Sequence, residues 1–405
     1  MASREYQPSQ EILAKYADVL TRFALNSGKG IRPGEVVYVL VPDVAKPLGH
    51  ALQRSILQAG GQPMIQLTPT GWDKDYFSLA NDAQLTFFPR AYLQERVKLI
   101  NHSIHILAEP DPFELADVDP EKLLKSRDAK KDYRDWLIEK ETKGNFTWTL
   151  ALWGVPAKAK IAKLSLEKYW EQIIAACFLD DADPVAKWQQ LHQQQLTLKS
   201  KLNELKMAKA HFVGPDMDIH FTVGADRTWE GGSGRNIPSF EFFTSPDWRG
   251  TTGWVKFNQP VFRYGQVMEG ISLEFANGVL TRAHARKGNA FLQQMIKSEN
   301  ANKVGEISLT DKRMSRITHF MADTLFDENI GGPFGNTHLA LGMAYHDCYR
   351  GSDAAKLTKE DWDKKGYNDS PEHTDIISTE DRTVTATLTD GSEVVIYRDG
   401  MFTML

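Results

Sequence analysis

The residues of this chain that could do chemistry are acids and histidines in its C-terminal half. They are spread over about 135 positions, each in or beside a short apolar run, and they are Glu241, Glu306, His338, His373 and Asp375. Such a mixture holds too much oxygen for a structural zinc site and suits catalytic divalent ions. Two ions about 3.5 to 4 Å apart need at least one carboxylate between them. The set predicts a metal-dependent hydrolase.

Taken singly, most of these residues also have an ordinary structural explanation. An ionised Glu241 among the aromatics of segment 238–243 would cost several kcal/mol unless it were paired or coordinated, but strand alternation also allows it to face solvent. Glu306 at the start of an apolar strand and the lone His338 are more readily structural residues. His373 and Asp375 stand two apart, so in a strand both point to one face. Only the five residues taken together support a metal site.

Other motifs carry less information. The glycine-rich segment 231–235 lacks the lysine and the strand-then-helix setting of a P-loop, so it is expected to be a turn. There is no Gly-x-Ser-x-Gly elbow. His102 and His105 are three apart and are expected to flank a strand. The glycine-rich loop 331–335 precedes His338, and such loops let the backbone approach a ligand closely.

Composition gives limits on the class of protein. The chain has 405 residues, 41% of them apolar, and a formal charge of -5, which favours two or three domains. Lys and Arg are dispersed, so no nucleic-acid partner is expected. No signal core and no run of about 18 apolar residues occurs, so neither secretion nor a membrane span is expected. The two isolated cysteines, Cys177 and Cys348, indicate reduced thiols and a cytoplasmic protein.

The elements that must position the candidate residues fall into two parts. An apolar strand at 35–41, a helix capped by Asp43 with Leu48, Leu52 and Ile56 on one face, and a strand at 64–67 form a βαβ unit. A strand at 103–107 and a helix at 123–140 repeat the alternation. Residues 1–185 are therefore predicted to form an α/β domain with a mostly parallel sheet.

The second part is predicted to be rich in β-structure. An amphipathic connecting helix at 186–207 precedes it, and its apolar stripe is expected to face a core rather than a coiled-coil partner. Asn277-Gly278, Asp390-Gly391 and Asp399-Gly400 indicate hairpins. Helices are expected at 288–298 and 317–325. Residues 208–405 are thus predicted to be an α+β domain that carries every candidate ligand.

Several segments of this domain resemble a known family. They are Asn236–Pro246, Gly305-Glu306, Leu325–Asn329, His338–Tyr345, His373–Asp375 and Tyr397–Gly400. In order, spacing and flanking context these segments are similar to the dinuclear metalloaminopeptidases of the aminopeptidase T and aminopeptidase S type. The resemblance extends more loosely over the rest of the chain.

The resemblance implies an activity and a site. Two divalent metal ions (Zn, Co, Mn or Mg) would activate water and release the N-terminal residue of short peptides. The ligands would be Glu241, Glu306, His338, His373 and Asp375. On this basis Glu306 is the candidate to carry the proton to the leaving amine, and Tyr345 to donate a hydrogen bond to the oxyanion. The family further implies a homodimer whose N-terminal domains enclose the site.

Two alternatives stay open. One is another dinuclear hydrolase such as a phosphoesterase, whose sites usually depend on Asp, Asn and several His. The other is a non-catalytic metal-binding relative, which the loss of a ligand would favour, although all five positions are filled.

Overall fold

The computed structural model describes residues 6–405. The chain forms two compact units, one containing the residues up to Gln189 together with Ser233–Pro238, the other Gln190–Gly232 together with Ser239–Leu405. A compact unit need not be an independently folding domain. The domain limits at residues 185 and 207 therefore stay a prediction.

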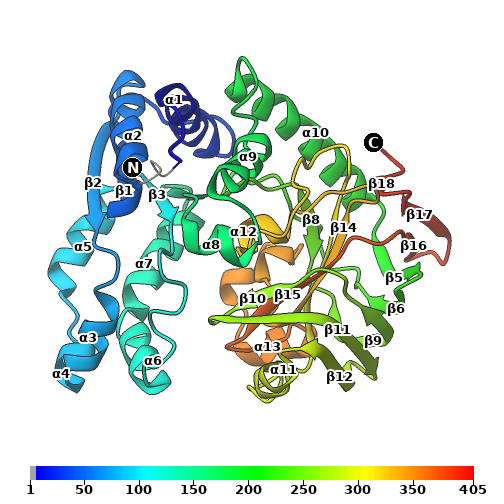
Figure 1. Cartoon of the computed structure of the whole chain (residues 1–405). Coiled ribbons are helices and arrows are strands. Elements are labelled where there is room, and N and C mark those ends of the chain that lie inside the picture. Colours follow the sequence, from blue (N-terminus) through cyan, green and yellow to red (C-terminus); the bar gives the residue numbers. More distant parts are fainter. Residues whose placement is uncertain (1–5) are drawn as a thin grey trace. The chain divides into compact units, whose positions relative to one another are not determined.

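A five-stranded parallel sheet forms the centre of the first unit (Figure 1), with the strand order β2-β1-β3-β4-β7. Its strands are β1 (Val36–Pro42), β2 (Gln62–Thr68), β3 (His102–Leu107), β4 (Thr147–Leu152) and β7 (Asn236–Ile237). Parallel neighbours need crossover connections. Helices provide them: α2 (Lys46–Gln58), then α3 (Asp73–Leu79), α4 (Asp82–Leu85) and α5 (Arg90–Leu99), then α6 (Pro120–Ala129) and α7 (Lys131–Thr142).

Further helices of this unit precede and follow the sheet strands. They are α1 (Gln10–Val19) with a π-helical turn (Leu20–Ala24), α8 (Pro156–Ile161) and α9 (Leu166–Ala176). His102, which was expected to flank a strand, lies in β3, where its Nε2 is 2.8 Å from Glu35 Oε2 and its Nδ1 2.8 Å from Thr147 Oγ1. These contacts give it a structural role.

The predicted βαβ unit is present, with one error in its cap. Leu48, Leu52 and Ile56 are completely buried on one face of α2. Asp43 does not cap this helix, because it lies in a 3₁₀ turn (Asp43–Ala45) that runs directly into α2. Its carboxylate instead accepts a hydrogen bond from the Thr70 hydroxyl at 2.7 Å.

The single helix predicted at 123–140 is wrong in its continuity. Two helices, α6 and α7, cover this range and meet at Lys130, whose ψ of 6° leaves the helical region. Neither helix has a strongly apolar face, and within this range only Ser126 is fully buried. Few side-chain packing contacts would hold the two segments in one continuous helix.

The connecting helix is α10 (Pro184–Glu204). Trp188, Leu191, Leu198 and Leu202 are buried, as expected for a helix whose apolar stripe faces a core. Leu205 lies beyond the end of the helix.

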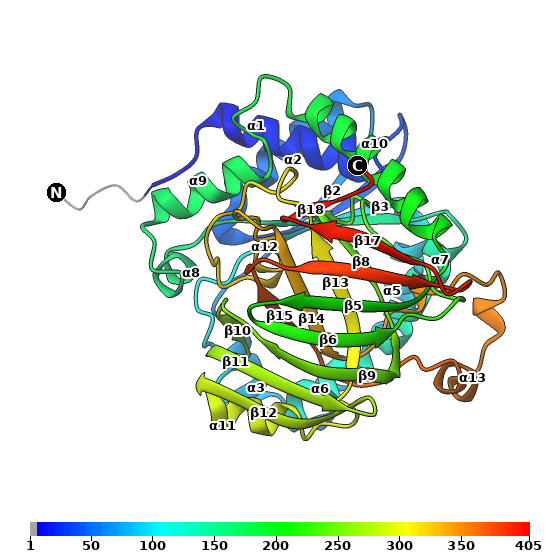
Figure 2. The same ribbon diagram turned by 90° about the vertical axis from the view of Figure 1, so that its right-hand side faces the viewer.

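A large antiparallel sheet forms one layer of the second unit. Its order is β10-β11-β9-β6-β5-β16-β17-β18, with β12 beside β11. Figure 2 shows β5, β6, β9, β11 and β12 lying side by side. The strands are β5 (Met207–Gly214), β6 (Met217–Thr222), β9 (Asp247–Lys256), β10 (Val261–Arg263), β11 (Gln266–Ala276), β12 (Val279–Lys287), β16 (Thr383–Leu388), β17 (Glu393–Arg398) and β18 (Met401–Phe402).

The three predicted hairpins lie in this sheet. Asn277 and Gly278 join β11 to β12 with φ values of 52° and 83°, the left-handed pair that a type I′ turn requires. Asp399 and Gly400 repeat this between β17 and β18. Gly391 supplies the positive φ between β16 and β17.

A second, four-stranded antiparallel sheet has the order β15-β14-β13-β8. Its strands are β8 (Glu241–Thr244), β13 (Val304–Thr310), β14 (Asn336–Gly342) and β15 (His373–Ser378). The short helices of this unit are α11 (Asn289–Met295), α12 (Thr324–Asp327) and α13 (Lys359–Lys364). A parallel sheet followed by antiparallel sheets confirms the predicted fold class.

One of the two helices predicted in this unit is mostly wrong. Helix α11 lies within the predicted range 288–298, but of 317–325 only the last residues join the single turn α12. The Asp327 carboxylate accepts hydrogen bonds from the backbone N–H groups of Met321 and Asp323. Ala322 between them has a φ of 53°, so side-chain bonding replaces the helical ladder here.

Both cysteines are buried and free of disulfides. Across residues 6–405, the helices are all too short or too polar to cross a membrane.

Candidate metal centre

Strand alternation places the predicted ligands on one face of the four-stranded sheet. Glu306 of β13 lies opposite Ala340 of β14, which in turn lies opposite Asp375 of β15. Paired residues of neighbouring strands project from the same face of a sheet. Glu306 and Asp375 therefore flank the small Ala340 side chain and face the same side.

Counted along the strands, the other three predicted ligands lie an even number of residues from this row of paired residues. His338 is two residues from Ala340, and His373 is two from Asp375. Glu241 of β8 lies opposite Thr310, four residues from Glu306 on β13. Since the side-chain period of a strand is two, all five predicted ligands project from one face.

The opposite face of this sheet is apolar and fully buried. It is formed by Phe242, Ile307, Leu309, Leu339, Leu341 and Ile376. A slip of one residue in any strand would move these side chains out of the core and charged groups into it. Burial of the apolar face thus sets the register that brings the acids and histidines together.

His338 is at the centre of the group. Its Nε2 lies 2.9 Å from Glu306 Oε1, 3.3 Å from Glu241 Oε2 and 3.9 Å from Asp375 Oδ1. All four side chains are buried, with His338 only 1% exposed. A buried ring nitrogen that faces three carboxylates is in a position that would suit a ligand to a cation.

His373 lies close to two of these carboxylates. Its Nε2 lies 3.5 Å from Asp375 Oδ1 and 3.8 Å from Glu306 Oε2. Its Nδ1 lies 2.8 Å from the carbonyl oxygen of Met343. A carbonyl can only accept, so Nδ1 carries a proton, and in its neutral form the ring would have its lone pair at Nε2. The structure thus brings all five predicted residues together.

The two oxygens of Glu306 face different imidazoles. Oε1 is the atom close to His338 and Oε2 is the atom close to His373. One carboxylate lying between two imidazoles is the arrangement that a bridging ligand of two ions needs.

The acids and histidines of the group shift one another's pKa values. Burial raises the pKa of Glu241 to about 8, with the neighbouring Glu306 and Asp375 charges adding to the rise. Burial alone would lower the pKa of His338, but its hydrogen bond with Glu306 and the charges of Glu241 and Asp375 outweigh this and raise it to about 9. Protons on these two groups therefore offset part of the negative charge of the neighbouring carboxylates.

The pKa values of His373 and Asp375 shift in opposite directions. Burial opposes the charged form of both groups, but the attraction between them dominates. It raises the pKa of His373 to about 9 and holds the pKa of Asp375 well below its usual range. Fully deprotonated, the five side chains carry three negative charges, which divalent cations would balance. The donor set fits such ions.

Tyr345 lies beside the group. Its ring centroid is 4.7 Å from that of His373 and 5.8 Å from that of Phe243. Burial and then the negative charges of Glu306 and Asp375 raise the pKa of its phenol. The hydroxyl therefore keeps its proton and can donate a hydrogen bond.

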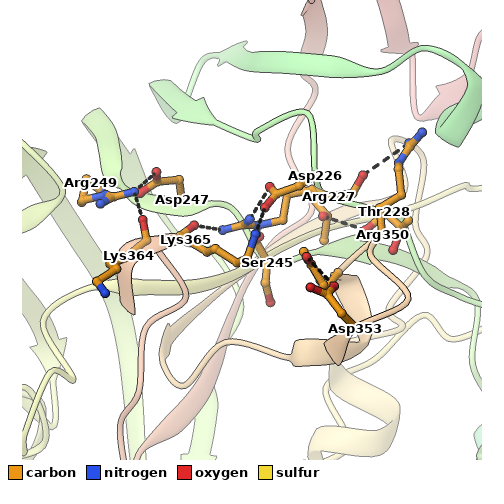
Figure 3. A network of polar contacts seen from close by, with 12 residues as sticks. Asp226, Arg227, Thr228, Ser245, Asp247, Arg249, Arg350, Asp353, Lys364 and Lys365 are labelled. Atoms are coloured by element: carbon orange, nitrogen blue, oxygen red, sulfur yellow. Dashed lines mark hydrogen bonds and ion pairs between the residues drawn. The ribbon is translucent and has the colours of Figure 1, made fainter. Parts of the chain in front are cut away.

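A polar network that the sequence did not reveal holds the backbone at Tyr345. The Ser245 hydroxyl accepts a hydrogen bond from the Tyr345 backbone N–H at 2.8 Å. Arg227 Nε in turn donates to the Ser245 carbonyl at 2.7 Å, and its Nη2 donates to the Lys365 carbonyl at 2.7 Å (Figure 3). Its guanidinium carbon lies 3.7 Å from the centroid of the Tyr367 ring. No motif around Arg227 indicates this role.

Asn329 connects the Asp-Glu-Asn segment to the site. Its Oδ1 accepts a hydrogen bond from the backbone N–H of Phe240 at 2.6 Å, and its Nδ2 donates to the Leu325 carbonyl at 3.1 Å. Phe240 directly precedes Glu241. The fully buried Asn329 thus fixes where β8 begins.

In the same region, two glycines lie where one backbone segment closely approaches another. A Cβ on Gly231 would lie 2.4 Å from the Glu241 carbonyl oxygen, and one on Gly335 would lie 2.2 Å from the Thr310 carbonyl oxygen. Gly335 is in the loop before His338, and its φ is 60°. Segment 231–235, expected to be a turn, is an irregular bend without a helix behind it. Glycine is needed at both approaches.

Glu328 is a further acid that was not assigned a role. It is buried, and its charge helps to raise the pKa of the Tyr345 phenol. Its Oε1 accepts a hydrogen bond from Asn329 Nδ2 at 3.3 Å. Its only signal in the sequence was its place in the segment Leu325–Asn329.

Buried carboxylates and two imidazoles on one sheet face, next to a protonated phenol, indicate the class of a metal-dependent hydrolase. The chain belongs to the family described as thermophilic metalloprotease (M29), which it matches over residues 9–402. It is 30% identical to aminopeptidase T of Thermus aquaticus, over 96% of this chain and 98% of that one. It is 26% identical to aminopeptidase 2 of Geobacillus stearothermophilus, over 96% and 97%.

A solved structure shares the fold. Wild-type AmpT from Thermus thermophilus superposes with a TM-score of 0.81 at 23% identity, covering 97% of this chain and 99% of that one. The predicted family is confirmed, and with it the class of a metal-dependent aminopeptidase.

Proposed function

We propose that the protein uses two divalent ions to release N-terminal residues from short peptides, and that Glu241, Glu306, His338, His373 and Asp375 hold these ions. One observation carries the proposal. Two imidazoles lie on either side of the Glu306 carboxylate, each 2.9 to 3.8 Å from one of its oxygens. Glu241 stands beside His338, and Asp375 faces both rings.

When bound, such ions would polarise the scissile carbonyl and lower the pKa of water toward neutrality. The residues of the chain supply orientation and proton transfer. Glu306 is the proposed proton carrier from the attacking water to the leaving amine, because its oxygens reach both halves of the site. Tyr345 is the proposed hydrogen-bond donor to the oxyanion, since its raised pKa keeps it protonated.

The α-amino group of the substrate needs a negative partner. Glu328 is the proposed one, since its charge acts on Tyr345 without its carboxylate being among the five ligands. Its hydrogen bond from Asn329 fixes one of its oxygens. Binding of a free ammonium at this position would restrict cleavage to the first peptide bond. Glu328→Gln would then raise KM for peptides and leave metal content unchanged.

The resemblance also supports a homodimer that admits only short peptides. A monomeric enzyme that efficiently trims the N-terminus of a folded protein would contradict this part of the proposal.

The identity of the ions is open to direct measurement. Zn, Co, Mn and Mg all accept mixed oxygen and nitrogen ligands. Metal analysis of the purified protein, followed by aminoacyl-nitroanilide hydrolysis with and without a chelator, tests both stoichiometry and activity. We expect at least two ions per chain at full activity, complete loss on chelation, and recovery on adding metal. Turnover of phosphate esters without peptidase activity would refute the proposal.

Glu306→Gln is the sharpest test of a single role. The amide cannot accept a proton, so we expect kcat to fall by a factor of about 10² or more after metal reconstitution. Glu299→Gln, outside the described centre, should behave as the parent. Hydrolysis by Glu306→Gln at the parental rate would show that the assignment is wrong.

A further inference from the structure

A second group of side chains of the types that can bind a metal ion lies on the large sheet of the second unit. His211 of β5 and His220 of β6 are directly paired across the two strands, and Asp218 is two residues from His220. None of the three is among the residues of the candidate metal centre, which belong to the four-stranded sheet. The strands that carry the group are visible in Figure 2.

All three side chains project from the solvent-facing side of the sheet. The alternating partners Ala210, Phe212, Ile219 and Phe221 are buried, so the odd positions of β5 and the even positions of β6 face outward. Thr385 and Thr252 lie opposite His211 and His220 on the flanking strands. Trp254 of β9 lies opposite Asp218 and borders the group on that side, while the three ligand side chains stay partly or fully exposed.

The ligand atoms are already close to one another. His211 Nε2 lies 2.8 Å from Asp218 Oδ1. The two imidazole rings are stacked, with centroids 3.7 Å apart and planes 12° from parallel. One donor atom from each of the three residues falls within 4.8 Å of the other two. Ligands of one tetrahedral ion at bond lengths of about 2.0 to 2.2 Å stand roughly 3.3 Å apart, so small side-chain rotations suffice.

We propose that His211, His220 and Asp218 form a surface site for a single transition-metal ion of the zinc class. The backbone pairing of β5 with β6 holds the two histidines in place, because Cβ atoms of directly opposed residues stand about 4.5 to 5.5 Å apart. Three protein ligands leave the fourth position to water.

The donor types select the ion. Two imidazoles and one carboxylate favour Zn²⁺, Cu²⁺ or Ni²⁺ over Mg²⁺ and Ca²⁺, which prefer oxygen ligands. The candidate centre on the four-stranded sheet has three carboxylates and two imidazoles, so Mg²⁺ distinguishes the two sites. The surface group should not take Mg²⁺.

Zinc stoichiometry tests the proposal. Full-length protein freed of metal is dialysed to equilibrium against buffered Zn²⁺, and bound zinc is measured for the parent, His211→Gln, His220→Gln and His284→Gln. His284 is an exposed histidine of β12 in the same sheet, so it is the matched control. We expect one equivalent less zinc in each of the first two variants, the parental value in His284→Gln, and parental peptidase activity in all three.

A gain of binding provides the converse test. Lys209 is two residues from His211 on the same outward face of β5, and its charge opposes a cation. Lys209→Gln should tighten zinc binding at this site by about twofold. Retention of the untagged protein on immobilised Ni²⁺ gives a second readout, which should fall for His220→Gln and not for His284→Gln. Equal zinc stoichiometry in the parent and His220→Gln would overturn the proposal.

Discussion

The two histidines of the candidate metal centre are held in different ways. His373 donates its Nδ1 proton to the Met343 carbonyl, which orients the ring and leaves Nε2 for a ligand role. His338 is buried with its Nδ1 unbonded to any residue of the described chain. The carboxylates around Nε2 of His338 are therefore its polar partners within residues 6–405. A cation bound there would replace the proton that this ring now shares with them.

Tyr345→Phe tests the proposed oxyanion donor. The change removes only the hydroxyl and keeps the ring against His373 and Phe243. A hydrogen bond made mainly in the transition state should cost kcat about 10²-fold or more and leave KM nearly unchanged. Steady-state kinetics with an aminoacyl-nitroanilide measures both constants.

The matched control is Tyr92→Phe, at an exposed tyrosine of the first unit. It should leave both constants at the parental values. A rise in KM with unchanged kcat in Tyr345→Phe would instead assign the hydroxyl to substrate binding.

At the scale of elements, the four-stranded sheet does most to build the centre. Each of its strands contributes one or two of the five side chains to the same face, with apolar residues on the other. Ala340, in the middle of that face, separates Glu306 from Asp375 with a single methyl group. A larger side chain there would occupy the space between the two carboxylates.

Asn329→Ala tests how a loop positions β8. The change leaves the Phe240 N–H and the Leu325 carbonyl without their buried partner. We expect a loss of about 2 to 4 kcal/mol in the free energy of unfolding, together with weaker metal binding through displaced Glu241. Denaturant unfolding and metal titration measure the two effects.

Asn145→Ala, at an exposed asparagine, is the control and should change neither quantity. If Asn329→Ala unfolded at the parental denaturant concentration, the hydrogen bonds of Asn329 would have no positioning role.

At the scale of the whole molecule, metal binding is coupled to protons. In the metal-free chain the pKa values of Glu241, His338 and His373 lie at about 8, 9 and 9, so these groups are protonated at pH 7. Ions need them deprotonated. Binding at pH 7 should therefore release protons, and apparent affinity should rise as pH increases from 7 toward 9, by up to tenfold per unit for each proton displaced.

Calorimetric titration of the metal-stripped protein checks this coupling. At pH 7, two buffers that differ in ionisation enthalpy should give different apparent heats of binding, and the difference should be clearly smaller near pH 9.5, where most of these protons are already lost. Identical heats at pH 7 would contradict the protonation states described above.

The five candidate ligands could be predicted from the sequence. The residues whose hydrogen bonds position the backbone around them could not. The five acids and histidines stand in short apolar runs with the right parity, and their surroundings resemble one family closely. Arg227, Ser245 and Asn329 stand in no pattern that indicates their contacts. Most of their hydrogen bonds join backbone groups distant in sequence, and such bonds leave no local periodicity.

Local patterns also determined most of the regular structure and failed where side chains compete with the backbone. Buried strands, α2 and the three hairpins follow from apolar periodicity and turn residues. Asp43 and Asp327 instead bond to Thr70 and to the backbone at Met321, which displaced one cap and most of one helix. Tertiary packing alone decided which face of each strand is buried, and therefore that five scattered side chains surround one point.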